Sequence, residues 1–264
     1  TQDTAKKTNN QYLISKPQNA AFPASDGHKL LSLLHRPPTL ETTEPWLLVL
    51  MHGVGSNEDD LFALADFVPG PFHVLSLRAP FVLGPGSYAW FEFSIEADGS
   101  RRIDADQETR SRAAVVRTVQ AALAQLGVPP DRMVLGGFSQ GGIMALSLLR
   151  TRPELLHGAM VMHSRLLPEV NALEAAPEAL AGKGLWVSHG QQDGGIPPAS
   201  GHALRDWAAA QPLMLRYEEF PGAHEIRLAE LQAAMQWLAS LAVPEGPRRA
   251  LGPNHRRIGP DSSE

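Results

Sequence analysis

The sequence predicts an α/β protein with a mostly parallel, doubly wound sheet flanked by helices. Short apolar runs that fit buried strands recur along the chain, and longer segments of helical periodicity separate them. One apolar run also leads through Gly137-Phe138-Ser139-Gln140-Gly141 directly into the apolar-rich segment 143–149. Strand, abrupt turn and helix in this order are typical of parallel sheets whose strands are joined by helical crossovers.

The first expected strand covers residues 29–36 and ends at Pro37-Pro38. The longest expected helix covers 107–126, where apolar residues follow helical spacing up to Gly127. A shorter helix is expected at 199–210. The remaining strands are expected at 47–51, 73–77, 133–135, 159–162, 185–188 and 213–217.

A single domain at 23–243 is predicted, between a flexible leader at 1–22 and a disordered tail at 244–264. The tail is rich in Pro, Gly and Arg, and its arginines could touch an acidic partner or simply be solvated. The chain has 264 residues, of which 43% are hydrophobic, so it can bury a sizeable core.

Composition excludes several classes of function. The net charge of −5 argues against a nucleic-acid partner. The chain has no cysteine, so it has no disulfide, no thiolate metal site and no cysteine nucleophile. No apolar run reaches the length of a membrane span, which argues against stable membrane insertion. No signal peptide is visible, which favours a cytoplasmic location, although the chain begins at Thr1 rather than Met.

Ser139 lies at the centre of a Gly-x-Ser-x-Gly turn between strand and helix. Such a turn strains the serine backbone and holds the hydroxyl clear of the sheet, where a base can reach it. The helix that follows supplies N–H groups and positive dipole potential where an oxyanion forms. The alternative is an ordinary strand-to-helix turn, because three fixed residues are a weak signal by themselves.

A nucleophilic serine needs a histidine base and a carboxylate, and α/β hydrolases carry them in the order Ser, Asp or Glu, His. Asp193, Asp206 and Asp261 are the aspartates after Ser139. Asp206 falls inside the expected helix, and Asp261 falls in the tail. Asp193 follows the strand at 185–188, where open α/β sheets place their site residues.

His202, His224 and His255 are the histidines after Asp193. His202 belongs to the start of the expected helix and His255 to the tail, whereas His224 follows a strand in the loop Pro221-Gly222-Ala223-His224-Glu225. Taken alone, Asp193 fits a turn cap and His224 a surface loop. Together with Ser139 they occupy three successive strand-to-helix junctions in the expected order, which favours a catalytic triad.

An oxyanion hole is expected after the strand at 46–51, which runs into the glycine-rich segment 52–57. Its donors would be the backbone N–H groups of Val54 and Gln140, because hydrolases use the N–H after the nucleophile and one from a loop of this kind. The segment also fits the start of a helix with a polar N-cap, and both roles can hold together. His52 is expected to brace this loop rather than act as a base.

These motifs resemble the landmarks of the phospholipase/carboxylesterase branch of the α/β hydrolases, which includes the acyl-protein thioesterases. The landmarks are Leu50-Met51-His52-Gly53-Val54-Gly55, Arg78-Ala79-Pro80, Trp90-Phe91, Gly136-Gly137-Phe138-Ser139-Gln140-Gly141-Gly142, His189-Gly190 with Asp193 and Ile196-Pro197, and Gly222-Ala223-His224. The resemblance covers about 46–241 and implies an α/β-hydrolase fold. It implies a cofactor-free and metal-free serine esterase that works through an acyl-enzyme. The nucleophile would be Ser139, the acid Asp193 and the base His224, with the hole at Val54 and Gln140.

The chain departs from the family pattern at two loops. The family usually has a Ser-Gly pair before a Leu-Pro, whereas this chain reads His163-Ser164-Arg165-Leu166-Leu167-Pro168. That loop runs beside the nucleophile in relatives, so substrate preference cannot be transferred from them. Asp193 is followed by Gly194-Gly195, where relatives usually carry an acidic or apolar residue.

Substrate contacts are expected from the aromatic segment 78–93 and from the loop 163–168, which differs from the family pattern. The residues predicted to line an acyl groove are Phe81, Leu83, Trp90, Phe91 and Leu166. The aromatic residues could instead cover the edge of the sheet, since a groove and an edge cover use the same residue types. No long insertion supplies a helical lid. We therefore expect acyl chains of roughly two to eight carbons, since each CH₂ contributes only while a wall buries it.

The leading functional hypothesis is a carboxylesterase that acts on a small-molecule ester. An acyl-protein thioesterase or lysophospholipase would use the same chemistry with a longer groove, and a serine peptidase would need a domain to gate peptides. A non-catalytic binding module on a hydrolase fold has no need to keep all three triad residues. A homodimer is left open.

Overall fold

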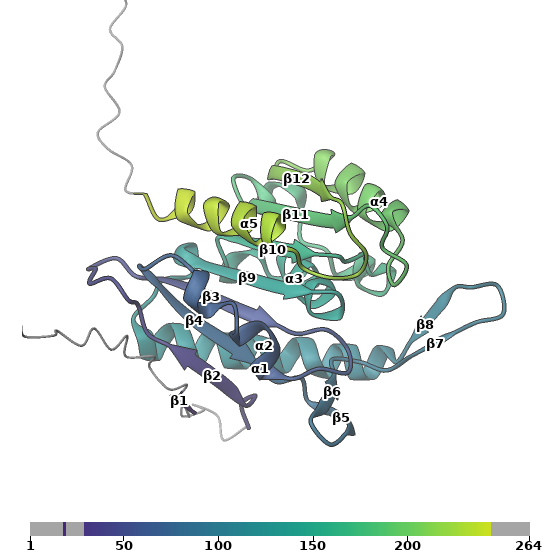
Figure 1. Cartoon of the computed structure of the whole chain (residues 1–264), viewed down its shortest axis with the longest axis horizontal. Coiled ribbons are helices and arrows are strands. Elements are labelled where there is room, and N and C mark those ends of the chain that lie inside the picture. Colours follow the sequence, from purple (N-terminus) through teal and green to yellow (C-terminus); the bar gives the residue numbers. More distant parts are fainter. Residues whose placement is uncertain (1–17, 20–28, 244–264) are drawn as a thin grey trace, which may run out of the picture.

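The structure is a computed structural model, and it describes residues 18–19 and 29–243 (Figure 1). The predicted tail at 244–264 and most of the predicted leader lie outside the described residues. An eight-stranded sheet runs in the order β1-β2-β4-β3-β9-β10-β11-β12. Its strands are β1 (Gln18–Asn19), β2 (Leu33–Arg36), β3 (Trp46–Met51), β4 (Phe72–Leu77), β9 (Met133–Phe138), β10 (Gly158–Met162), β11 (Gly184–Gly190) and β12 (Met214–Phe220).

From β4 to β12 all strand pairs are parallel, and β1 and β2 add an antiparallel edge. The parallel part winds outward from β3 in both directions. The carboxyl ends of β3, β9, β10, β11 and β12 therefore meet at one edge of the sheet, which is where ligand sites form in open α/β folds. The predicted α/β-hydrolase architecture, with a mostly parallel doubly wound sheet, is confirmed.

Helices cover both faces of this sheet, and the side-chain alternation of the strands explains why. In β3, Leu47 and Val49 pack into a core with α2 (Ala105–Leu126), α3 (Gln140–Thr151) and α4 (Pro198–Ala209). Leu48 and Leu50 point to the other face, where α1 (Glu58–Phe62) and α5 (Leu228–Leu241) pack. A strand that is buried on both faces reads as a continuous apolar run, as residues 46–51 do.

Short 3₁₀ helices occupy several connections. They lie at Ala65–Phe67, Pro130–Arg132, Pro153–Leu155, Pro168–Leu173 and Pro177–Leu180. The long helix α2 begins after Asp104, whose side chain accepts a hydrogen bond from the N–H of Gln107 at 3.0 Å. It ends at Gly127, whose backbone is left-handed with φ 65°. No helix among residues 18–19 and 29–243 has the length and apolarity needed to cross a membrane.

Two segments differ from expectation. The strand predicted at 29–36 is the shorter β2, because the N–H of Leu31 bonds to Oγ1 of Thr118 on α2, at 3.1 Å, instead of to a neighbouring strand. The segment expected to be an aromatic loop forms the hairpin β5 (Phe81–Gly84) and β6 (Ser87–Ala89). A second hairpin, β7 (Phe93–Ile95) and β8 (Arg101–Ile103), follows and extends away from the body of the domain (Figure 1).

Candidate active site

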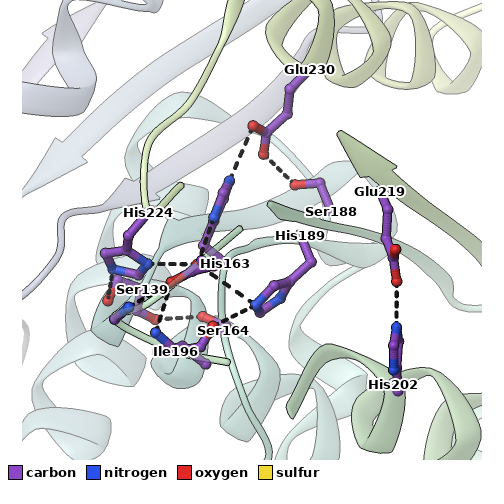
Figure 2. Close-up of polar contacts among 12 residues, drawn as sticks. Ser139, His163, Ser164, Ser188, His189, Ile196, His202, Glu219, His224 and Glu230 are labelled. Atoms are coloured by element: carbon purple, nitrogen blue, oxygen red, sulfur yellow. Dashed lines mark hydrogen bonds and ion pairs between the residues drawn. The ribbon is translucent and has the colours of Figure 1, made fainter. Parts of the chain in front are cut away.

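Ser139, Asp193 and His224 meet at the carboxyl edge of the sheet. Ser139 lies between β9 and α3, Asp193 follows β11, and His224 follows β12. These strands are close neighbours in the sheet, so three residues that are far apart in the sequence come together; Figure 2 shows Ser139 beside His224.

The three side chains form one hydrogen-bonded line. Nε2 of His224 lies 2.9 Å from Oγ of Ser139, and Nδ1 of His224 lies 2.8 Å from Oδ2 of Asp193. When Nδ1 carries the proton, the ring donates to the carboxylate and Nε2 can accept the proton of the hydroxyl. The arrangement therefore suits proton transfer from a nucleophilic serine to a histidine whose orientation a carboxylate fixes.

Ser139 has the strained backbone that the Gly-x-Ser-x-Gly motif predicts, with φ 54° and ψ −118°. A Cβ on Gly137 would lie 2.2 Å from the backbone of Gly141, and a Cβ on Gly141 would lie 1.9 Å from the carbonyl oxygen of Met51. Only glycine fits at these two positions. The turn is also held from the next strand end, because the hydroxyl of Ser164 donates to the carbonyl of Ser139.

The N–H groups of Val54 and Gln140 have no protein hydrogen-bond partner within the described part of the chain. Gln140 is the first residue of α3, so its N–H carries the positive end of the helix dipole. The side chain of Ser139 does not cap this helix, since His224 holds the hydroxyl instead. Both predicted oxyanion donors are thus free to receive a hydrogen-bond acceptor.

His52 braces the loop that carries Val54, as expected. Its Nδ1 lies 2.7 Å from the carbonyl of Gly53, and its Nε2 accepts from the N–H of Ala79 at 3.1 Å. The ring is fully buried, and burial lowers the pKa of His52 despite the opposing effect of the hydrogen bond that the ring donates to the carbonyl of Gly53. A neutral ring with its proton on Nδ1 satisfies both contacts.

Asp193 accepts four hydrogen bonds in a site that solvent does not reach. Its Oδ1 accepts from the N–H groups of Gly195 and Ile196, each at 2.8 Å. Its Oδ2 lies 2.8 Å from His224 and 2.9 Å from Nδ1 of His163. Burial would raise the pKa of Asp193, but the hydrogen bonds from His224, His163 and Ile196 outweigh it and lower that pKa.

His163 and Glu230 are parts of this site that the sequence did not reveal. His163 occupies the loop after β10 that departs from the family pattern, and its second nitrogen lies 3.1 Å from Oε2 of Glu230 on α5. The unusual histidine at the strand end was a visible signal. Glu230 had none, because a glutamate in the first turn of a helix fits an exposed position equally well.

His163, Asp193 and His224 also have the spacing of a metal site, since their potential ligand atoms lie within 4.8 Å of one another. Each of these atoms already belongs to the hydrogen-bonded line that starts at Ser139. The hydrogen bonds are therefore sufficient to account for the close spacing of these side chains.

The residues predicted to line the acyl groove lie in different surroundings. Trp90 and Phe91 are 0% and 1% exposed and belong to the main core, so they offer no surface to a substrate in this structure. Phe81 lines a separate cavity of about 500 Å³ beside the β5–β6 hairpin, whose lining includes no triad residue. Leu83 is exposed on that hairpin, and Leu166 is half-buried against the core.

Trp90 instead supports the loop of the predicted oxyanion hole. Its indole N–H donates to the carbonyl of His52 at 2.9 Å. Its backbone N–H donates to the side chain of Gln140 at 2.7 Å, and the same amide donates to the carbonyl of Phe91 at 2.6 Å. The aromatic pair thus belongs to the packing beneath the site, because its backbone and ring are both tied to the neighbouring loops.

A different cavity borders His224, one of the three residues of the predicted triad. It has a volume of about 320 Å³, and its wall includes His224 and Phe138 together with the apolar side chains of Leu61, Leu64 and Ile226. The ring of Phe138 lies 4.8 Å from the ring of His224. Two carboxylates, Asp60 and Glu225, complete the lining.

The sequence matches the model of the phospholipase/carboxylesterase family over residues 40–242. The chain belongs to the phospholipase/carboxylesterase family. The match covers both predicted oxyanion donors and the three residues of the hydrogen-bonded line. The resemblance noted from the motifs is therefore confirmed.

Similar proteins agree with this family. The chain is 29% identical to acyl-protein thioesterase 1 of Neurospora crassa over 157 residues, which are 58% of this chain and 64% of that protein. It is 26% identical to the putative hydrolase MhqD of Bacillus subtilis over 201 residues, which are 75% of this chain and 94% of that protein. The solved structure of a Bacillus cereus carboxylesterase superposes with a TM-score of 0.69 at 24% identity, covering 80% of this chain and 94% of the other.

These relatives place the chain in a family of carboxylesterase and acyl-protein thioesterase-type hydrolases. The solved structure supports the fold alone. Its sequence identity to this chain is too low to indicate which substrate this chain uses. The loop 163–168, which begins with His163, differs from the Ser-Gly and Leu-Pro pattern that is usual in the family.

Proposed function

We propose that this hydrolase is a serine carboxylesterase that cleaves esters of short to medium acyl chains through an acyl-enzyme. The observation that carries the proposal is the unbroken hydrogen-bonded line from Ser139 through His224 to Asp193. The unpartnered N–H groups of Val54 and Gln140 beside it supply the second requirement of acyl transfer, a site for the oxyanion.

In the proposed reaction, Ser139 attacks the acyl carbon while Nε2 of His224 takes the hydroxyl proton. The charge that develops on the carbonyl oxygen is held by the N–H groups of Val54 and Gln140. Asp193 stabilises the imidazolium without taking its proton, and His224 then protonates the leaving alcohol. Water repeats the sequence on the acyl-enzyme, with His224 as base, and releases the acid.

The cavity beside His224 is the proposed site for the apolar part of the ester. Its volume of about 320 Å³ lies at the lower end of the range of small-molecule pockets. Leu64 and Ile226 supply half-buried apolar wall. A small pocket of this kind supports a preference for acyl chains of roughly two to eight carbons, since further methylenes would stay in water.

The test of the nucleophile is Ser139→Ala, with Ser147→Ala as the matched control. Ser147 is a buried serine of the same helix, and its hydroxyl has no partner within the described residues. Ser139→Ala should lower kcat by about 10⁴-fold or more and abolish labelling by a fluorophosphonate probe. Ser147→Ala should keep both. If Ser139→Ala retained more than about a hundredth of the rate, the assignment would be wrong.

The test of the pocket is a series of p-nitrophenyl esters measured on Ile226→Ala and on Leu173→Ala. Leu173 is half-exposed and does not line the cavity, so its variant controls for the loss of a surface aliphatic side chain. Ile226→Ala should lower kcat/KM for hexanoate and octanoate more than for acetate, by a few-fold for each methylene that loses its wall. An equal loss at every length would place Ile226 outside the acyl site.

An acyl-protein thioesterase is the second candidate, because relatives from Neurospora crassa and Schizosaccharomyces pombe carry that name at 29% identity each. The chemistry at Ser139 would be identical, so only substrates separate the two. A palmitoyl thioester should be tested beside the ester series. An optimum at long acyl chains, or a thioester rate well above that of the matched ester, would favour the thioesterase.

A further inference from the structure

His163 is a buried histidine with a carboxylate at each ring nitrogen. Nδ1 lies 2.9 Å from Oδ2 of Asp193, and Nε2 lies 3.1 Å from Oε2 of Glu230. The other oxygen of Glu230 accepts from the hydroxyl of Ser188 at 2.5 Å. His163 thus links Glu230 to the catalytic carboxylate by a second line of hydrogen bonds, and Figure 2 shows the part of it that joins His163, Glu230 and Ser188.

Solvent reaches none of these groups. The side chains of His163 and Glu230 are each 1% exposed, and that of Asp193 is 0% exposed. Two carboxylates in such surroundings are costly unless a cation lies between them and hydrogen bonds satisfy their oxygens. A charged imidazole at 163 meets both requirements.

Counting protons leads to the same charge. Each nitrogen of His163 faces a carboxylate oxygen, so both contacts need a proton to be hydrogen bonds. A free imidazole, with a pKa of about 6.5, holds a proton more tightly than a free carboxylate, with a pKa of about 4. The shared protons therefore belong on the ring, and His163 carries a positive charge.

The charges around His163 also favour its protonated form. Burial would lower the pKa of His163, but the hydrogen bonds and charges of Glu230 and Asp193 outweigh it and raise that pKa. Two other histidine rings face it, His189 at 5.5 Å and His224 at 5.7 Å. His189 has no partner for Nδ1 among the described residues, and burial lowers its pKa, so the charge that opposes the two carboxylates lies on His163.

The backbone of His163 is strained, with φ 50°. Among the described residues, Ser139 is the only other non-glycine residue at positive φ. Strain at a non-glycine residue persists only where surrounding contacts fix it, and it concentrates at functional sites. The ring of this strained residue lies between Asp193 and Glu230 and contacts both.

We propose that His163 is a positioning residue for the catalytic acid: as an imidazolium ion anchored by Glu230, it fixes the Asp193 carboxylate and lowers the pH at which the esterase loses activity. The proposal rests on the esterase function proposed above. Its physical basis is that a positive charge beside Asp193 opposes the arrival of a second positive charge on His224.

The variant that separates charge from shape is Glu230→Gln. A glutamine can still accept from Ser188 and can donate its amide N–H to Nε2 of His163, so the hydrogen bonds remain while His163 becomes neutral. We expect the midpoint of the acidic limb of kcat/KM to rise by about one pH unit. That is the order expected when a unit positive charge 5.7 Å from the His224 ring is lost, because the simultaneous loss of the negative charge of Glu230, at the far nitrogen of His163, offsets part of its effect.

The matched control is Glu219→Gln. Glu219 also accepts from a histidine, His202 at 2.5 Å, and from Tyr217 at 2.8 Å, but it touches no residue of the triad. The same substitution there should leave the acidic limb within about 0.2 pH units of wild type, a shift of under about 0.3 kcal/mol. His163→Asn tolerates the left-handed backbone and removes the charge by a second route, so it should move the limb in the same direction as Glu230→Gln.

The charge itself is measured without turnover, by ¹⁵N NMR of histidine-labelled wild-type protein with His163→Asn to assign the signal. Both ring nitrogens of His163 should remain protonated at pH 8 in wild type and in Glu219→Gln, and not in Glu230→Gln. A neutral His163 at pH 7 overturns the proposal, as does an unshifted acidic limb in Glu230→Gln. Failure of the esterase assignment would appear separately, as absent fluorophosphonate labelling of a protein whose His163 is still charged.

Discussion

Gln140→Met should damage both stability and activity, because one side-chain amide joins the nucleophile helix to the loop below the oxyanion hole. The oxygen of the Gln140 amide accepts from the N–H of Trp90 at 2.7 Å, and its nitrogen donates to the carbonyl of Phe91 at 2.6 Å. Methionine has nearly the same length and is flexible, so it fills the space without replacing either bond.

The expected loss can be worked out from these two contacts. Gln140, Trp90 and Phe91 are all buried, so water cannot replace the amide. Each buried backbone group that loses its only partner costs about 1–3 kcal/mol, which gives about 2–6 kcal/mol for the pair. That is a large share of the 5–15 kcal/mol by which a domain is typically stable, and it corresponds to a drop in Tm of about 5–20 °C.

The Gln140→Met variant should also lose activity, because Trp90 holds the loop that carries Val54. The indole N–H of Trp90 holds the carbonyl of His52, two residues before the proposed oxyanion donor. When the backbone of Trp90 is released, that donor loses its fixed position. Removal of one oxyanion donor costs about 10²–10³ in kcat, so a partial displacement should cost about tenfold.

Gln107→Met is the matched control for these measurements. Gln107 makes a similar pair of contacts, to the backbone N–H and the side chain of Glu92, each at 2.7 Å. Glu92 is exposed, so water can replace the lost bonds, and the cost should stay within about 1 kcal/mol. Urea unfolding and kcat for the p-nitrophenyl acetate reaction decide the matter. If Gln140→Met matched Gln107→Met in both, the amide would not brace the site.

Three further predictions concern the hydrogen-bonded line. Asp193→Asn should lower kcat by about 10⁴-fold, because the wrong tautomer of His224 is then favoured, while chelators should leave the rate unchanged; inhibition by EDTA that zinc reverses would contradict the mechanism. Ser164→Ala should lower kcat about tenfold, since the carbonyl of Ser139 loses the hydroxyl that holds it, and unchanged kinetics would remove Ser164 from the site. Because the pKa of His163 is raised in the folded protein, its protonation adds to the free energy of unfolding below about pH 6.5. This contribution is lost as pH rises through the raised pKa. The advantage of wild type over Glu230→Gln in urea should therefore shrink between pH 6 and pH 9, and a growing advantage would show that the sign is wrong.

The sequence was sufficient for the central strands β3, β4, β9, β10 and β11 because almost all of their residues are buried. Continuous apolar runs such as residues 46–51 have few alternative interpretations once helical segments separate them. The hairpins between β4 and α2 could not be predicted in the same way. Their strands are short and largely exposed, so turn glycines such as Gly86 and Gly99 were the only local signals, and an aromatic loop fitted the same composition.

The candidate triad followed from chain order and from the ends of strands, both of which are local properties of a sequence. The residues that line the substrate pocket could not be predicted in this way. Trp90 and Phe91 were expected at a groove, but the polar groups that bind them come from α2, α3 and the loop of His52. Whether an aromatic residue faces a pocket or the core depends on such distant partners, which no local pattern records.

The strained residues at the ends of β9 and β10 explain how one sheet edge supports both hydrogen-bonded lines. The N–H of Ser139 donates to the carbonyl of Met162 at 2.9 Å, and the N–H of His163 donates to the carbonyl of Ser188 at 2.9 Å. Each left-handed residue is thus tied to the strand that follows it in the sheet, so the ladder continues through the turn instead of fraying. Because the cost of each strained residue, about 1–3 kcal/mol, is offset by rigid neighbours, the hydroxyl of Ser139 and the ring of His163 hold fixed positions around Asp193. A positive φ at the ends of two adjacent strands thus presents the proposed nucleophile at one position and the proposed cation at the next.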